Sequence, residues 1–418
     1  MKDTKVHLED KRESRLFFVF LLLMYAVVYM TKNCFSGALA AIVAEGSLTL
    51  TQTSLISAAF YIAYAPLQVL GGALADKYSP ERLITIGLLG SAVANAVIFI
   101  NQNYYVMLVA WVFSAIVQFA LWPALFKIIS SQLVRSDRPK MAFFISFGSS
   151  IGLILSYIVS AFIPKWQYNF MISAVSLVLA AVCLQLYCRH LDPILKRDYE
   201  PAEQISDRSF EGVSSHKHSS LKLFWISGFI MLLPAVLIRT MVENGSKTLS
   251  PTMLMQSYEH ISPTIGNLLN IFIIVSGVIG MILVKFVLYP KIIKNEITGY
   301  LIMLIVALPF TVVLRFVGLA PVWLIVMSLC MISLLLTSTH LFTQYFNLNF
   351  TKYGKNGLAA GVLNAAASFG LVLQYWVFGS IADDFGWQVV TALWIGMMAS
   401  AILCIAFAVG PAKKFKKM

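Results

Sequence analysis

The sequence predicts an all-α membrane protein with twelve transmembrane helices in two parallel six-helix repeats. The chain of 418 residues is 59% hydrophobic and only 12% charged, and its mean hydropathy is +0.80. Such values exclude an ordinary soluble domain. A helix that crosses the bilayer needs about 20 consecutive apolar residues. Segments of this kind recur along the whole chain, and a motif in one half is repeated in the other.

We expect each span to be one such apolar segment bounded by polar or turn-forming residues. The twelve predicted spans begin near Leu16, Leu55, Leu83, Tyr105, Met141, Tyr168, Leu221, Ile265, Thr298, Val322, Leu358 and Val389.

The distribution of basic residues predicts the orientation. Most of the 31 Lys and Arg lie in every second connection and at both termini, and Lys165, Lys247 and Arg315 are assigned to the opposite loops. Because cytoplasmic loops carry the excess of Lys and Arg, both termini are expected to be cytoplasmic. The net charge of +12 is therefore a topology signal, and no nucleic-acid partner is expected.

A hydrophilic stretch divides the chain into two halves. Residues 188–220 are rich in charge and serine and are predicted to be a cytoplasmic linker between halves at 1–187 and 221–418. Ser150–Tyr157 reads SIGLILSY, and Ser368–Tyr375 in the second half reads SFGLVLQY. A parallel six-plus-six repeat is typical of the major facilitator superfamily, whose substrates bind near the midplane between the halves.

The connection after the second span supports this interpretation. Residues 72–82, GALADKYSPER, look like the Gly-x-x-x-Asp-Arg/Lys loop signature of that superfamily. Asp76 is expected to face a helix N-terminus or a cation and to act as a latch. The alternative is an ordinary turn that contains a proline.

Three basic residues fall inside apolar segments, namely Lys32, Lys127 and Arg239. A charge in hydrocarbon costs at least about 2.5 kcal/mol, so an intramembrane cation indicates a functional site. No carboxylate lies securely in a span to neutralise them. The arrangement predicts an anionic ligand.

Lys32 and Arg239 lie at similar depth in spans one and seven, which correspond in the repeat. They are predicted to clamp one anion from both sides, with Arg as a planar fork and Lys as a point charge. The alternatives are snorkelling for Lys32 and simple neutralisation of Arg239 by Glu243, one turn away. Lys127 lies near the cytoplasmic end of its span, which favours a structural or gating role.

Other polar and aromatic residues share helix faces that could line the site. Tyr29 lies on the Lys32 face, and His340 could couple transport to protons. Each residue could instead form hydrogen bonds between helices. The predicted substrate-binding residues besides the two cations are Tyr29, Tyr64, Gln118, Trp122, His340 and Asn364, and the predicted gating or coupling residues are Asp76, Lys127 and Glu243.

Several short motifs, in order and spacing, resemble the organophosphate:phosphate antiporters. They are Tyr29-x-x-Lys32-x-x-Phe35, Ile62-Ala63-Tyr64, Asp76-Lys77-x-Ser79-Pro80, Trp122-Pro123 before Lys127, and Ser250-Pro251-Thr252. The resemblance implies exchange of a phosphorylated sugar or polyol for phosphate, in a plasma (bacterial inner) membrane.

The resemblance also implies site residues, with departures. The family binds the phosphoryl group with a basic residue in span one, usually Arg, and this chain has Lys32 there. For the second basic position, Ser250-Pro251-Thr252 aligns Glu243, and Arg239 lies one turn further in. Gln68 and Ser149 stand where the family has a lysine and a histidine. The chain therefore looks like a divergent member.

The function predicted is secondary transport of a small organic anion by alternating access, without enzymatic activity, cofactor or metal, in a protein expected to be monomeric. The five cysteines have no ligand spacing. One rival is a proton-coupled carrier for carboxylates that uses Glu243 or His340. Another is a membrane sensor with the transporter fold that signals through a partner.

Overall fold

In a computed structural model, almost the whole described chain is helical. The structure describes residues 4–134, 136–145, 147–199, 220–289 and 291–417. The first half contains β1 (Thr4–His7), α1 (Lys11–Lys32), α2 (Cys34–Glu45), α3 (Leu50–Lys77), α4 (Pro80–Ile100), α5 (Tyr104–Gln118), α6 (Leu121–Ser131), α7 (Arg138–Phe144), α8 (Phe147–Phe162), α9 (Tyr168–Leu191) and β2 (Lys196–Tyr199).

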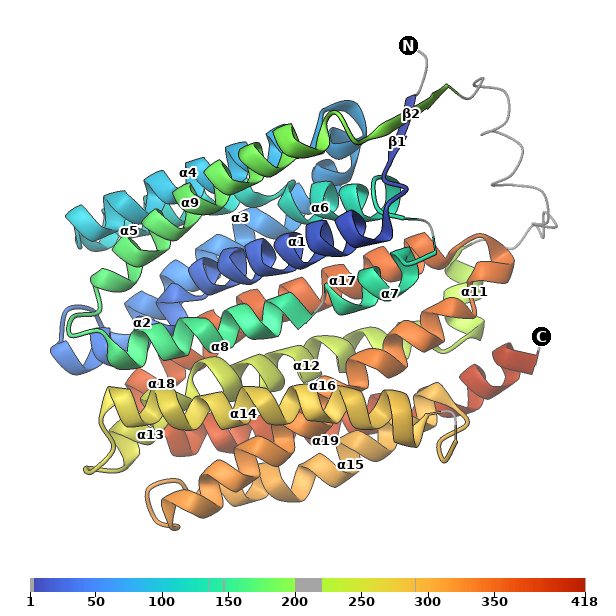
Figure 1. The fold of residues 1–418 in the computed structure, drawn as a ribbon. Helices are drawn as coiled ribbons and strands as arrows, with labels where there is room; N and C mark the ends of the chain where they lie inside the picture. Colours follow the sequence, from blue (N-terminus) through green and yellow to red (C-terminus); the bar gives the residue numbers. More distant parts are fainter. Residues whose placement is uncertain (1–3, 135, 146, 200–219, 290, 418) are drawn as a thin grey trace. The chain divides into compact units, whose positions relative to one another are not determined.

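The second half has the same helical character (Figure 1). It contains α11 (Ser220–Ile226), α12 (Phe229–Thr248), α13 (Ser250–Ser257), α14 (Pro263–Leu283), η1 (Val284–Leu288), α15 (Glu296–Val313), η2 (Leu314–Phe316), α16 (Val322–Leu348), η3 (Thr351–Tyr353), α17 (Asn356–Leu373), η4 (Gln374–Phe378), α18 (Gly379–Phe385) and α19 (Trp387–Lys417). The strands β1 and β2 form one antiparallel pair.

The predicted spans correspond to helices of the structure. Among the described residues, ten helices are long and apolar enough to cross a membrane. The 28-residue α3 and the shorter apolar helix α8 lie at the predicted second and fifth spans. The prediction of an all-α polytopic membrane protein is confirmed.

The two halves repeat the same helix packing. In the first half α1 packs on α8 and α4 packs on α5 and α9, and the corresponding pairs in the second half are α12 with α17 and α15 with α16 and α19. The repeated motif has a physical basis in these contacts. A Cβ at Gly152 would lie 2.3 Å from the Ala26 carbonyl oxygen, and one at Gly370 would lie 2.8 Å from that of Leu237. In both halves glycine permits close approach to the first helix.

By their contacts the described helices divide into two compact units that do not coincide with the halves. One unit comprises Met1–Ala38 and Ala59–Gly212, and the other comprises Leu39–Ala58 and Val213–Met418. Leu39 and Leu50 belong to the apolar core of the second unit. Residues 200–219 of the predicted linker lie outside the described residues, and the division into 1–187, 188–220 and 221–418 stays a prediction.

The segment Leu39–Ala58, here called the exchanged segment, comes from the first half of the chain but belongs to the second unit. Hydrogen bonds from Thr51 connect it to α18 of that unit. The backbone N–H and the hydroxyl of Thr51 both donate to Oδ2 of Asp383 in α18, each at 2.6 Å. Thr51 is in the first turn of α3, where backbone N–H groups lack intrahelical acceptors, so the carboxylate acts as a cap. Close packing continues nearby, because a Cβ at Gly379 would lie 2.4 Å from Ser54 Oγ.

Candidate functional site

Lys32 is the last residue of α1, at a break in the first span. Asn33 separates α1 from α2, and its side-chain amide donates to the Tyr29 carbonyl at 2.7 Å. The Ser156 hydroxyl on α8 donates to the Asn33 carbonyl at 2.8 Å. The Tyr29 and Asn33 carbonyls also accept hydrogen bonds from the backbone N–H groups of Asn33 and Gly37, so the side-chain bonds add to the backbone ones at this break. The break therefore places a lysine at an irregular point of the helix.

The ammonium of Lys32 lies in a box of aromatic rings. Its Nζ is 3.8 Å from the ring centroid of Tyr64, and it lies 5.2, 5.4 and 5.5 Å from those of Phe60, Tyr61 and Tyr29. Ring faces attract cations, most strongly when the pair is desolvated. No carboxylate in the described part of the chain forms an ion pair with Lys32. The structure thus brings Tyr29 and Tyr64 to Lys32.

Trp122 is connected to the rings around Lys32 through aromatic contacts, whereas the side chain of Gln118 forms a hydrogen bond within its own helix. The Trp122 ring packs on Tyr25 with 5.1 Å between centroids, and Tyr25 packs on Tyr29 at 4.9 Å, so aromatic contacts lead from Trp122 to the Lys32 box. Gln118 is buried and donates to the Ser114 hydroxyl at 3.0 Å on its own helix. Its amide therefore takes part in a contact within α5.

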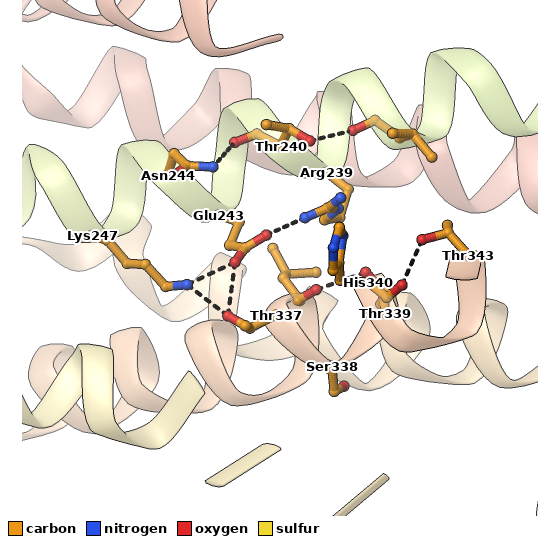
Figure 2. A network of polar contacts seen from close by, with 12 residues as sticks. Arg239, Thr240, Glu243, Asn244, Lys247, Thr337, Ser338, Thr339, His340 and Thr343 are labelled. Atoms are coloured by element: carbon orange, nitrogen blue, oxygen red, sulfur yellow. Dashed lines mark hydrogen bonds and ion pairs between the residues drawn. The ribbon is translucent and has the colours of Figure 1, made fainter. Parts of the chain in front are cut away.

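In the second unit, Arg239 belongs to a buried charge cluster on α12. One Glu243 oxygen accepts from Arg239, and the other accepts from Lys247 at 2.7 Å and from the Thr337 hydroxyl at 2.8 Å. Lys247 also donates to Thr337 on α16 at 2.6 Å. Figure 2 shows Glu243 between the two cations. The side chains of Arg239, Glu243 and Lys247 are 6, 8 and 10% exposed, so the cluster is buried.

This cluster corrects two statements made from the sequence. Lys247 is buried inside α12, and the prediction that it lies in an outer loop is wrong. The expectation that no carboxylate lies securely in a span is also wrong, because Glu243 is in α12 and pairs with Arg239. Residues four apart meet on one helix face, so Glu243 and Lys247 enter the span as a pair. That spacing was visible in the sequence.

Arg239 and the predicted residues His340 and Asn364 line one cavity. Its volume is 330 Å³, and it lies between α12, α16 and α17. Figure 2 shows the guanidinium of Arg239 next to the His340 ring. The Nε of Arg239 is buried without a hydrogen-bond partner among the described residues. The polar residues lining the cavity are Arg239, His340, Thr343, Gln344, Asn347 and Asn364.

The predicted gating residues have distinct environments. Lys127 on α6 donates to the Ala75 carbonyl near the end of α3 and so connects two helices of the first unit. Helix C-termini favour cations. Asp76 lies in α3, but its side chain is outside the described part of the structure. Glu243 is the centre of the charge cluster.

The sequence interpretation missed several residues that the structure associates with these sites. They are Phe60 and Tyr61 beside Lys32, Lys247 beside Glu243, and Asn347 in the cavity. For Phe60 and Tyr61 the only signal was an aromatic run around the predicted Tyr64.

The helix count and the repeated packing define a polytopic membrane protein built from two similar halves. A family model described as Major Facilitator Superfamily matches residues 21–352, and the chain belongs to this superfamily of membrane transporters, so it is a transporter and not an enzyme.

Three curated relatives match shorter stretches. "Membrane sensor protein UhpC" of Escherichia coli (strain K12) is 25% identical over 114 residues, 27% of this chain and 26% of that protein. "Probable hexose phosphate transport protein" of Chlamydia trachomatis is 22% identical over 121 residues, 29% and 26% of the two chains. "Probable sulfoacetate transporter SauU" of Cupriavidus necator is 36% identical over 66 residues, 16% and 15%. The matches thus span about a quarter or less of these relatives.

Solved structures support the fold over nearly the whole chain. A mutant of the peptide transporter POT in complex with alafosfalin has a TM-score of 0.72 at 13% identity, covering 96% of this chain and 95% of its own. A mutant of the nucleoside transporter NupG has a TM-score of 0.69 at 14% identity, covering 93% and 100%. At such identities the likeness concerns the fold alone.

Proposed function

We propose that this transporter moves a small organic anion, a phosphorylated sugar or polyol, in exchange for phosphate by alternating access. A relative named as a hexose phosphate transport protein supports this substrate class, and one named for sulfoacetate supports an anion. The proposal includes a bacterial inner membrane location, cytoplasmic termini and a monomeric protein.

The observation that carries the proposal is the state of Lys32. Its charge is enclosed by aromatic rings and has no carboxylate partner in the described part of the chain. Ring faces offset only part of the cost of desolvating an ammonium, about 2 kcal/mol or more at best. An anionic substrate supplies the missing counter-charge. An empty site therefore disfavours closure, which is the behaviour of an exchanger.

Arg239 is the second proposed anion-binding residue. It lines the cavity of the second unit, and its buried Nε has no hydrogen-bond partner among the described residues. Glu243 holds another part of the guanidinium. In this proposal Glu243 orients Arg239 and partly balances its charge, while Lys247 and Thr337 hold Glu243 in place.

The test is exchange in proteoliposomes loaded with labelled phosphate. External glycerol 3-phosphate, glucose 6-phosphate and simple carboxylates are added in turn, and release of label is followed. We expect release by the phosphorylated compounds in the wild type and its loss in Lys32→Ala. Lys165→Ala, which removes an exposed lysine without a bond to the Lys32 box, is the matched control. Normal exchange by Lys32→Ala would refute the role of Lys32.

A sensor function is the second candidate, because the relative UhpC is named as a membrane sensor protein. A sensor would bind a phosphorylated ligand without moving it. Glucose 6-phosphate that stabilises the purified protein against heat, combined with no release of label, would favour the sensor over the exchanger.

A further inference from the structure

The cavity of the second unit has two chemically different parts. Arg239 and His340 provide a cationic or donor part, and three amide side chains provide the other. On α16, His340, Gln344 and Asn347 are four and three residues apart and share one helix face. On α17, Gly361 and Asn364 are three residues apart and face the same cavity.

The amide side chains suit a ligand that carries hydroxyl groups. Each amide offers two donor hydrogens and an acceptor oxygen, and a hydroxyl can both donate and accept. Oδ1 of Asn347 is buried and has no hydrogen-bond partner among the described residues. A buried acceptor left unpaired costs about 1–3 kcal/mol, so a donor group on a ligand would stabilise it. A ligand hydroxyl can donate to such an acceptor and accept from a neighbouring amide.

The cavity is also larger than a phosphate needs. Its 330 Å³ lies within the range of about 300–1,000 Å³ found for ligand pockets, and one water takes roughly 30 Å³. Space remains beside an anion bound at Arg239 for an organic group.

Gly361 contributes to this space. A Cβ at this position would meet no atom within 4 Å, so close helix packing does not require a glycine here. Glycine within a helix is less favourable than alanine by roughly 0.5–1 kcal/mol. Helix packing therefore does not explain why position 361, which lines the cavity, is a glycine.

We propose that Gln344, Asn347 and Asn364, around the open position at Gly361, bind the hydroxyl groups of the transported organic phosphate and determine which organic group is accepted. This inference rests on the proposed function, because it assigns the organic part of the same substrate. A polyhydroxylated substrate, such as a hexose phosphate, uses all three amides. A smaller polyol phosphate uses fewer of them.

The experiment compares substrates in the same variant. Proteoliposomes loaded with labelled phosphate are given external phosphate, glycerol 3-phosphate or glucose 6-phosphate. For Gly361→Leu we expect the ratio of glucose 6-phosphate exchange to phosphate exchange to fall about tenfold, with glycerol 3-phosphate in between. Gly361→Ala is expected to show a smaller change in the same order.

The amide residues are tested by Asn364→Ala and Gln344→Ala. We expect each to raise the KM for glucose 6-phosphate more than that for phosphate. Gly396→Leu is the matched control, since a Cβ at Gly396 on α19 also meets no atom within 4 Å and Gly396 does not line the cavity. Its substrate ratio is expected to equal that of the wild type.

The outcomes separate the two proposals. If the wild type exchanges no phosphorylated compound, the proposed function fails, and this inference fails with it. If the wild type exchanges them and Gly361→Leu lowers all three substrates equally or matches Gly396→Leu, the inference alone is refuted. A selective loss of glucose 6-phosphate exchange supports it.

Discussion

Replacing Glu243 with glutamine is expected to destabilise the second unit through its buried charges. The substitution keeps the side-chain size and removes the carboxylate that pairs with both Arg239 and Lys247. Breaking a buried ion pair by removing one partner costs about 3–5 kcal/mol. Lys247 keeps its hydrogen bond to Thr337, and the glutamine oxygen can still accept one bond. We therefore expect a loss near the lower end, about 3 kcal/mol.

A double variant tests whether charge is the cause. In the wild type, Arg239, Lys247 and Glu243 carry a summed charge of +1. Glu243→Gln raises this sum to +2, and adding Lys247→Met returns it to +1. We expect the second substitution to restore most of the lost stability.

The assay is reversible unfolding in mixed micelles with increasing sodium dodecyl sulfate, followed by tryptophan fluorescence. Wild type, both single variants and the double variant form a double-mutant cycle, and Glu259→Gln, at an exposed position outside the spans, is the control. A coupling below about 0.5 kcal/mol would lie within ordinary additivity and would refute the reasoning.

Three further expectations concern other contacts of the structure. Asp383→Asn weakens the cap on the Thr51 backbone N–H. Amide hydrogen exchange at Thr51 should therefore become roughly fivefold faster, equivalent to about 1 kcal/mol. Unchanged exchange, or the same increase in the control Asp384→Asn, would contradict this expectation. Lys127→Met removes the bond to the Ala75 carbonyl and should cost about 1.5–3 kcal/mol of stability with little change in substrate KM; a large rise in KM would instead indicate a role in binding. Gly152→Ala places a Cβ 2.3 Å from the Ala26 carbonyl oxygen and should sharply lower the yield of folded protein in the membrane. Gly396→Ala is the control. A yield equal to that of the control would mean that α1 and α8 can separate at little cost in free energy.

Much of the fold is predictable from sequence because hydrophobic length is a local property. Every predicted span corresponds to a helix, since a membrane leaves the backbone few other ways to satisfy its hydrogen bonds. The sequence analysis assigns Lys247 to an outer loop because a single charged residue, such as Glu243 or Lys247, disfavours a place inside a membrane span. As an i, i+4 pair they enter it together.

The surroundings of the candidate site residues were less predictable because they depend on how helices are rotated against one another. Phe60 and Tyr61 reach Lys32 only through the packing of α3 beside α1. The helix break at Asn33 involves neither proline nor glycine and is accompanied by a hydrogen bond from Ser156 on another helix. Neither contact follows from local sequence.

The exchanged segment Leu39–Ala58 has a consequence for how the protein is made. Thr51 and its partner Asp383 are 332 residues apart. At synthesis rates of roughly 5–20 residues per second, about 17–66 s pass before the ribosome reaches that partner. During this interval the connection between α2 and α3 is already in place without its final neighbours. The contacts of the connection between α2 and α3 therefore cannot be completed until α18 has been translated. A substitution near the end of the chain that disturbs α18 would thus be expected to cause misassembly at this early helix pair.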